Sequence, residues 1–286
     1  MIVVKDLTFT YSSAKEPAVK DVNLKIEEGE FVLFLGPTGC GKTTLCRCLN
    51  GLIPHFYRGH MMGYVKINGL DTRKHPVHSL ALKVGLVFQN PEEQMVALTV
   101  EREIAFGLEN LAVPRREMIK KLEKISSILE IKHLMKRRTD DLSGGEVQKV
   151  AIGAILVTEP SVLILDEPTA NLDPQSVETL AGTIKRLNRK EGITVILTEH
   201  RLDHIIPYVG RVVLMNKGRI LMDGEPREVL SSINAEETGI YLPRIIELYK
   251  KLKKKGVVLA QPPISIEEFY EFMRGYIYDS SGERMV

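Results

Sequence analysis

The chain has 286 residues, of which 44% are hydrophobic and 27% are charged. This balance predicts one or two folded domains with a buried core and excludes a disordered chain. Because the chain has 39 Lys and Arg residues against 37 Asp and Glu residues, its formal net charge is only +2 and gives no general basic field for nucleic acid.

Three further features limit the cellular setting. No apolar run approaches the roughly 18–20 residues that are needed to cross a bilayer. The N-terminus lacks a basic region followed by an apolar one, so we expect no signal peptide. The three cysteines are too few for a disulfide framework, and they favour a reducing, cytoplasmic setting.

Short apolar runs that alternate with helical patterns predict the fold class. Residues 2–9 indicate an opening strand with one register shift, and residues 22–26 alternate strictly between apolar and polar side chains. Continuous apolar runs, typical of strands buried on both faces, follow at residues 31–35, 84–88, 162–165 and 193–197. We therefore expect an α/β protein with a mainly parallel core sheet.

Two regions depart from this strand pattern. Residues 90–149 carry apolar side chains at helical spacing, which predicts a helical subdomain inserted between two core strands. Residues 212–222 have the pattern of a β-hairpin, and after them a lysine-rich run and Pro262-Pro263 mark a change in composition. We therefore divide the chain into a main domain, residues 1–235, and a small C-terminal helical extension, residues 236–286.

The first chemical motif lies directly after the apolar run at residues 31–35. It reads Gly36-Pro37-Thr38-Gly39-Cys40-Gly41-Lys42-Thr43 and fits the pattern G-x-x-x-x-G-K-[ST]. Glycines at this spacing let successive backbone N–H groups point at phosphate oxygens, and the helix that follows adds the positive end of its dipole. Lys42 can reach the β- and γ-phosphates of a nucleotide, and the Thr43 hydroxyl can bind Mg²⁺. Cys40 occupies a variable position, and we interpret it as a bystander.

Polar side chains follow three other buried runs. Asp166 and Glu167 follow residues 162–165, where Asp166 can hold Mg²⁺ through its water shell and Glu167 can polarise an attacking water. Gln89 and His200 come just after two further runs. Ligands of open α/β sheets bind at the carboxyl ends of the strands. These four side chains can therefore all point toward one γ-phosphate.

A second predicted helix N-terminus also suits phosphate. The segment Asp140-Asp141-Leu142-Ser143-Gly144-Gly145-Glu146 precedes an apolar helix expected at about residues 147–157. Ser143 can cap that helix, and the two glycines leave its first N–H groups uncovered. A helix cap alone would explain the segment. If it binds phosphate, either the chain takes two ligands or two copies of the chain share each nucleotide, and the pattern does not decide between them.

Together, these motifs resemble those of the ATP-binding cassette (ABC) ATPases, a family of P-loop NTPases. The matching elements, in the family's order and spacing over about residues 1–230, are residues 36–43, Gln89, residues 142–146, residues 163–167, Leu172-Asp173 and His200. The resemblance implies ATP hydrolysis, an N-terminal antiparallel β portion beside the core sheet, and a head-to-tail dimer. Two residues depart from the family pattern, since Glu146 replaces a glutamine and Lys149 replaces an arginine.

The resemblance also implies a role for each site residue. The expected catalytic residues are Glu167, His200 and Gln89. The expected ligands of Mg²⁺ are Thr43, Gln89 and Asp166. Tyr11 lies where the family places an aromatic ring that stacks on adenine, and Thr44 extends the phosphate loop. ATP would lie between that loop and Ser143, Gly144 and Gly145 of a second subunit, and residues 170–173 would communicate across the interface.

A narrower resemblance concerns the ATPases of energy-coupling factor (ECF) importers, including the cobalt-type importers. It rests on residues 87–94, on residues 101–111 and on the C-terminal stretch from residue 242 to residue 268. It implies import of a vitamin or metal ion at the cytoplasmic face of the cell membrane, with an integral coupling subunit and a substrate-binding membrane subunit as partners. The tail would help to hold two ATPase subunits together, as a homodimer or with a related second ATPase.

The contact with the membrane subunit is expected at Glu92, Glu93 and Gln94, although a solvated acidic loop would also explain these residues. Two other functional classes compete with transport. Soluble ABC proteins of DNA repair or translation usually carry long coiled coils or two fused cassettes, which this chain lacks, and we expect no nucleic-acid partner. A P-loop kinase or GTPase lacks support, because Asn216-Lys217-Gly218-Arg219 misses the Asp of a guanine-reading N-K-x-D motif.

Overall fold

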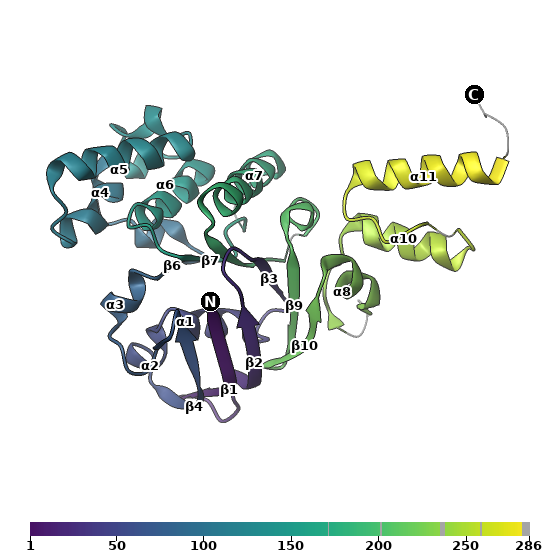
Figure 1. Ribbon diagram of the computed structural model, residues 1–286, viewed down its shortest axis with the longest axis horizontal. Coiled ribbons are helices and arrows are strands. Elements are labelled where there is room, and N and C mark those ends of the chain that lie inside the picture. The colour runs from purple at the N-terminus through teal and green to yellow at the C-terminus, as the bar shows by residue number, and fades with distance from the viewer. Residues whose placement is uncertain (171, 201, 235–237, 258, 282–286) are drawn as a thin grey trace.

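The computed structural model describes residues 1–170, 172–200, 202–234, 238–257 and 259–281, with backbone alone for residues 275–281. Two β-sheets and the helices around them form the main body, and a helical insertion and a helical tail extend from opposite ends of it (Figure 1). Within these described ranges, no helix combines the length and the apolar character that a membrane span requires.

The elements have the following bounds. The strands are β1 (Ile2–Tyr11), β2 (Val19–Ile26), β3 (Phe31–Leu35), β4 (Gly59–Ile67), β5 (Leu70–Asp71), β6 (Val84–Val87), β7 (Val162–Asp166), β8 (Thr194–Thr198), β9 (Arg211–Asn216) and β10 (Arg219–Gly224). The α-helices are α1 (Lys42–Leu49), α2 (Leu52–His55), α3 (Val77–Ala81), α4 (Val100–Asn110), α5 (Arg115–Ile128), α6 (Gly144–Leu156), α7 (Pro174–Glu191), α8 (Pro226–Ser232), α10 (Arg244–Lys254) and α11 (Ile266–Ser281). Short 3₁₀ helices are η1 (Pro91–Gln94), η2 (Lys132–Leu134), η3 (Thr139–Asp141) and η4 (Ile206–Tyr208).

The core sheet has the strand order β10-β9-β3-β8-β7-β6, and only β10 runs antiparallel to its neighbour. Every residue of β3, β6, β7 and β8 is buried, as the continuous apolar runs predicted. The mainly parallel sheet expected from the sequence is therefore confirmed. Because β3, β8, β7 and β6 are parallel neighbours, the loops that follow them all start at one edge of the sheet.

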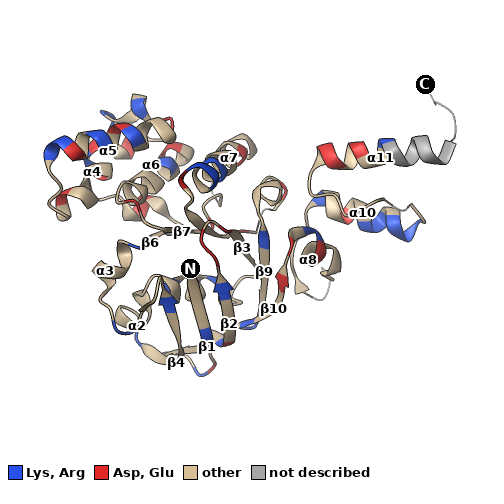
Figure 2. Ribbon diagram, in the orientation of Figure 1, with Lys and Arg blue, Asp and Glu red and all other residues tan. Residues whose placement is uncertain are grey.

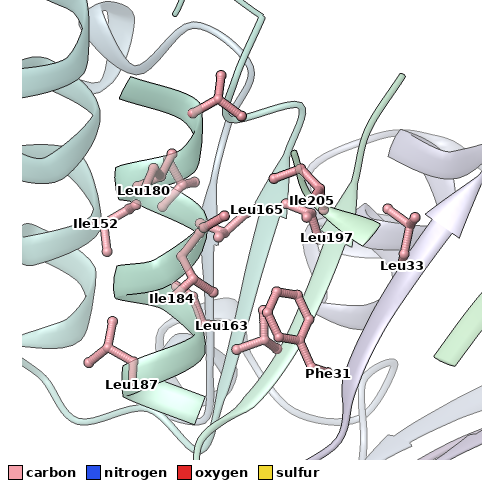
Figure 3. Close-up of a cluster of buried hydrophobic side chains, with 14 of the residues drawn as sticks. Phe31, Leu33, Ile152, Leu163, Leu165, Leu180, Ile184, Leu187, Leu197 and Ile205 are labelled. Carbon is pink, nitrogen blue, oxygen red and sulfur yellow. The ribbon is translucent and has the colours of Figure 1, made fainter. Parts of the chain in front are cut away.

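Side chains that alternate along these strands pack into two separate clusters. Phe31 and Leu33 point to the face covered by α6 and α7, where Leu180 and Ile184 of α7 meet Leu163 of β7 (Figure 3). Val32, Phe34, Ile164 and Ile196 belong to the cluster on the other face, with α1 and the second sheet. Both faces of the core sheet are thus covered by apolar side chains, so polar side chains lie at the ends of the strands.

The second sheet is antiparallel, with the order β2-β1-β4-β5, and confirms the N-terminal antiparallel portion that the family resemblance implied. The pairing of β1 with β2 contains two irregularities, where the sequence had predicted one register shift. Strand β4 was not predicted at all. Only two of its nine residues, Val65 and Ile67, are buried, so the strand carries neither a clear alternation nor an apolar run.

The insertion consists of α4, α5 and the start of α6, as the helical spacing within residues 90–149 predicted. The predicted hairpin is also present, as β9 and β10 joined through Lys217 and Gly218. Both loop residues have positive φ, 45° and 78°, as a two-residue type I′ turn requires.

The tail begins inside the main core. Ile240, Leu242 and Ile246 are buried in the cluster that covers the core sheet, so α10 is packed where it starts. Arg227 of α8 donates to both carboxylate oxygens of Glu268, at 2.8 and 2.7 Å, and thereby ties the start of α11 to the main domain. Figure 2 shows lysines along α10 and acidic residues at the start of α11. The predicted domain boundary falls at residues that lie outside the described ranges.

Gly63 provides a test of the antiparallel sheet. Its φ is +74°, and a Cβ atom at this position would lie 2.3 Å from the carbonyl oxygens of Lys5 and Asp6. We expect Gly63→Ala to lower the free energy of unfolding by at least about 2 kcal/mol, measured by urea denaturation. Gly182→Ala in α7 is the matched control, because nothing lies within 4 Å of its Cβ position. It should stabilise the protein by roughly 0.5–1 kcal/mol, and equal effects of the two changes would contradict the described sheet.

Candidate functional site

The phosphate loop joins β3 to α1 and is held against the second sheet. Gly41, directly before α1, has a φ of +108°, and a Cβ atom there would lie 2.3 Å from the carbonyl oxygen of Ala18. Only glycine fits this close approach of two backbones. The carbonyl of Cys40 accepts a hydrogen bond from Gly218 N at 2.9 Å, which fixes the loop against the β9–β10 hairpin.

Lys42 turns its ammonium group into the loop. Its side chain is buried, and Nζ donates to the carbonyl oxygens of Gly36 at 2.7 Å and Pro37 at 3.3 Å. This arrangement places a positive charge at the centre of the cradle, where a phosphate would find it. The Cys40 sulfur lies 4.0 Å from the same Nζ, and burial raises the pKa of the Cys40 thiol. The thiol therefore stays protonated at neutral pH, in line with the bystander interpretation.

The polar residues predicted at three strand ends meet at Glu167. Its Oε2 accepts a hydrogen bond from Gln89 Nε2 at 2.8 Å, and its Oε1 lies 2.8 Å from His200 Nε2. These three side chains follow β6, β7 and β8, which are adjacent in the core sheet. Both oxygens of one carboxylate are thus oriented by groups from two other loops, and the carboxylate remains partly open to solvent.

Asp166, the last residue of β7, is held by Thr198 at the end of β8. Asp166 is 4% exposed, and Thr198 Oγ1 donates to its Oδ1 at 2.7 Å. The backbone N–H of Glu167 in turn donates to the carbonyl oxygen of Thr198 at 3.1 Å and to its Oγ1 at 2.9 Å. Thr198 does not belong to the motifs that the sequence shows. Its signal was only a hydroxyl residue at the end of an apolar run.

The donor set that was expected to hold Mg²⁺ consists of oxygen atoms. A hydroxyl at Thr43, an amide oxygen at Gln89 and a carboxylate at Asp166 are hard ligands that suit this cation. Gln89 uses its Nε2 toward Glu167, so its amide oxygen stays available. Among the described residues, no group of three or more His, Cys, Asp and Glu side chains could form a dedicated cage for a metal ion. The residues therefore fit a cation that shares its coordination with water and phosphate.

Tyr11 lies beside the start of α1. Its hydroxyl is 3.1 Å from Thr44 Oγ1 and accepts a hydrogen bond from Arg47 at 3.4 Å. The Arg47 guanidinium lies 4.4 Å from the ring centroid of Tyr57, an aromatic residue outside the sequence motifs. The predicted adenine-stacking residue and the predicted phosphate-binding residue Thr44 are therefore neighbours.

The segment Ser143–Gly145 lies at the N-terminus of α6, within the helical insertion. Glu146 accepts hydrogen bonds from the backbone N–H of Ser143 at 2.8 Å and from its hydroxyl at 3.0 Å, and it pairs with Arg137 at 3.2 Å. The backbone hydrogen bond from Ser143 is the main reason that the pKa of Glu146 is lowered. This carboxylate is therefore compensated locally. The described hydrogen bonds of this segment stay within the insertion and do not reach the phosphate loop.

A cavity of about 210 Å³ separates this segment from the catalytic cluster, with Gln89, Glu92, Gly144, Pro168 and Ala170 among its lining residues. Beyond it, Asp173 caps the N-terminus of α7 and accepts hydrogen bonds from the backbone N–H groups of Gln175 and Ser176. Asn171, part of the predicted communication loop, lies outside the described residues.

The three residues expected to contact a membrane subunit all lie in η1, where two are exposed and the third is partly buried. Gln94 accepts from the backbone N–H of Phe88 at 2.9 Å and donates to the carbonyl of Leu86 at 3.4 Å, so its amide is used within the domain. Glu92 and Glu93 are exposed. Glu93 accepts one hydrogen bond from Asn90 at 2.9 Å.

Comparison with known proteins assigns this architecture to a family. A family model described as ABC transporter matches residues 19–170. A putative ABC transporter ATP-binding protein of Pyrococcus horikoshii is 43% identical over 259 residues, which cover 90% of this chain and 91% of that protein. Several other curated relatives are longer, and the chain spans less than half of their length.

Solved structures agree with the sequence relatives. The structure of CbiO1 from Clostridium perfringens, described as part of the ABC transporter complex CbiONQ, is similar with a TM-score of 0.74 and 32% identity, over 87% of this chain and 98% of that chain. The ATP-binding cassette MJ0796, solved as a dimer in a post-hydrolysis state with ADP and Pi, has a TM-score of 0.69 and 28% identity, over 79% and 99% of the two chains. The chain therefore belongs to the ABC transporter family and is the ATP-binding cassette of such a transporter, which hydrolyses ATP to drive transport.

Proposed function

We propose that this cassette powers an ECF-type importer of a vitamin or metal ion. The main observation in support of ATP hydrolysis is the position of Glu167. Its two carboxylate oxygens contact Gln89 and His200 at the sheet edge where the phosphate loop also starts. The ECF assignment is supported by the similarity to CbiO1, which is described as part of a CbiONQ complex. The helical tail after residue 240 adds support, since it matches the resemblance found in the sequence.

In this proposal the chain's own residues bind the nucleotide in three places. Lys42 exchanges its contacts with Gly36 and Pro37 for phosphate oxygens, and the N–H groups of the loop surround the same oxygens. Thr44 and Tyr11, already neighbours, lie toward the α-phosphate and the base. Because this binding uses parts of one subunit only, it does not depend on a partner.

Hydrolysis would centre on Glu167, which takes the proton of the attacking water. Gln89 donates to one carboxylate oxygen, and His200, with its Nε2 protonated, donates to the other, so that the base is oriented before the water arrives. Thr43, Gln89 and Asp166 would hold Mg²⁺, which when bound neutralises charge on the β- and γ-phosphates. Thr198 keeps the Asp166 carboxylate in place through its hydroxyl.

A second subunit would complete each site. No described hydrogen bond joins the segment Ser143–Gly145 to the phosphate loop of its own chain, so the segment would cover the triphosphate bound by another copy or by a related ATPase. The MJ0796 cassette, which was solved as a dimer with ADP and Pi, supports this arrangement. The N-terminus of α6 would then add its dipole to the Ser143 hydroxyl at the γ-phosphate.

The transport partners would be an integral coupling subunit and a substrate-binding membrane subunit, with the ATPase pair at the cytoplasmic face of the membrane. Glu92 and Glu93, exposed beside Gln89, are the proposed contact with the coupling subunit. Closure and reopening of the ATPase pair would move that contact. Gln94 serves within the domain instead, where it orients the end of β6.

Gentle detergent extraction of the tagged chain, followed by mass spectrometry, tests the transporter assignment. We expect two hydrophobic membrane proteins to purify with the chain, because the ATPase is held at the membrane only by its partners. Recovery of the chain without membrane proteins, together with ATPase stimulation by DNA or ribosomes, would contradict the proposal and favour a soluble ABC protein.

Replacing Glu167 by Gln tests the general base. The change keeps the size of the side chain but removes the proton acceptor, so we expect the rate of ATP hydrolysis to fall roughly 10²–10⁴-fold. Binding of a fluorescent ATP analogue should be unchanged, because the phosphate loop is intact. Hydrolysis at the wild-type rate would remove Glu167 from this role.

The Glu167→Gln variant also provides a test of the shared site, since it should accumulate with ATP bound. We expect ATP to convert this variant to a dimer in sedimentation experiments. Adding Ser143→Glu should abolish the dimer, because a second negative charge would face the γ-phosphate across the interface. Binding of the fluorescent analogue to the single subunit should persist. An ATP-dependent dimer that survives Ser143→Glu would rule out the proposed closure.

A further inference from the structure

Glu199 is a buried carboxylate that the scheme above does not use. It lies between Thr198 and His200, is 2% exposed, and forms no ion pair with any described Lys, Arg or His side chain. Burial raises the pKa of Glu199, and the nearby charge of Glu167 raises it further. A carboxylate is costly to bury unless hydrogen bonds compensate for lost water. Its position therefore calls for a specific function.

The two oxygens of Glu199 accept hydrogen bonds from two different loops. Oε1 accepts from the backbone N–H of Thr169 at 3.0 Å, and Oε2 accepts from the backbone N–H of His200 at 3.2 Å. Thr169 lies two residues after Glu167, and the His200 side chain contacts Glu167 at 2.8 Å. The contacts therefore close a ring that runs from Glu167 through Thr169, Glu199 and His200 back to Glu167.

The backbone at Glu167 needs such support. Its φ is +50°, a left-handed conformation that costs a non-glycine residue roughly 1–2 kcal/mol and persists only where neighbouring contacts hold it. Thr198 secures this residue on its N-terminal side, through its carbonyl and hydroxyl oxygens. On the C-terminal side, Glu199 joins the segment after Glu167 to the loop after β8. Its side chain accepts the hydrogen bond from the backbone N–H of Thr169.

We propose, on the basis of the function assigned above, that Glu199 is a positioning residue for ATP hydrolysis, which fixes the His200 imidazole and the Glu167 carboxylate against each other. The described hydrogen bonds of Glu199 come from the loops after β7 and β8, and none of them involves the phosphate loop. Its loss should therefore reduce turnover and leave nucleotide binding intact. A carboxylate suits this position because both of its oxygens accept, whereas a glutamine would turn an NH₂ group toward one of the two N–H donors.

The test compares Glu199→Gln with a matched control, Glu103→Gln, in the full-length chain. Glu103 is 6% exposed and accepts two backbone hydrogen bonds at one oxygen, Oε2, from Val96 at 2.9 Å and Ala97 at 2.7 Å, and it lies on α4 in the insertion. We expect Glu199→Gln to lower kcat for ATP hydrolysis about 10- to 100-fold. KM for ATP and the affinity for a fluorescent ATP analogue should change less than about twofold. Glu103→Gln should keep the wild-type kcat.

A double variant distinguishes a positioning role of Glu199 from a general loss of structure. Glu199→Gln added to Glu167→Gln should cause no further loss of residual hydrolysis, because Glu199 acts through Glu167. If Glu199→Gln does not fold, Glu199→Asp, whose shorter carboxylate can still accept, should fold and show an intermediate kcat with unchanged KM.

Two results would overturn the inference: a wild-type kcat for both Glu199 variants, or a fall in kcat matched by an equal loss of ATP affinity. These outcomes leave the proposed function intact, provided that the wild-type protein hydrolyses ATP. Absence of hydrolysis by the wild-type protein, alone and with its membrane partners, would instead overturn the proposed function.

Discussion

The parallel arrangement of β3, β8, β7 and β6 is the constraint on which the site depends. These strands are buried on both faces, so polar side chains have a place only where the strands end. Parallel neighbours end at one edge, which brings the phosphate loop, His200, Glu167 and Gln89 within reach of one another. The packing that seals the two faces thereby also determines where the chemistry can occur. Hydrogen bonds at 2.8 Å then select the orientation of each group.

In the proposed dimer, each subunit would supply only part of an ATP site. The phosphate loop and the catalytic cluster lie at the edge of the core sheet, whereas the segment Ser143–Gly145 belongs to the insertion, where Ser143 bonds to Glu146. Glu146, which replaces the usual glutamine, is compensated by Ser143 and Arg137 rather than left as a free negative charge. The segment can therefore approach a triphosphate without presenting an uncompensated carboxylate.

Much of the fold followed from local sequence pattern. The four buried strands and the hairpin at Lys217-Gly218 were predicted because an apolar run or a turn motif is a property of a few adjacent residues. Strand β4 was missed because its pairing with β1, and not its own side chains, makes it a strand. Sequence spacing could place Gln89, Glu167 and His200 at strand ends, but only the folded chain shows that they meet at one carboxylate.

The site residues that went unrecognised act through contacts between distant segments. Glu199 is 30 residues from Thr169 in sequence, and the groups that it holds are backbone N–H groups, which every residue except proline carries. No side-chain pattern marks such a contact. Gln94 was expected to contact a membrane subunit, and its contacts within the domain were not foreseen for the same reason, since the atoms that engage its amide are the backbone of Phe88 and Leu86.

The packing of the tail bears on how such a cassette could be shortened or fused. Ile240, Leu242 and Ile246 lie beyond the main domain as the sequence defines it, yet they fill the core beside the sheet. Burial of side chains of this size contributes roughly 1.5–3 kcal/mol each. A protein cut at residue 235 would therefore expose an apolar surface and lose stability. A gene fusion that appends another domain would have to keep α10 and Ile264, which also packs against this cluster.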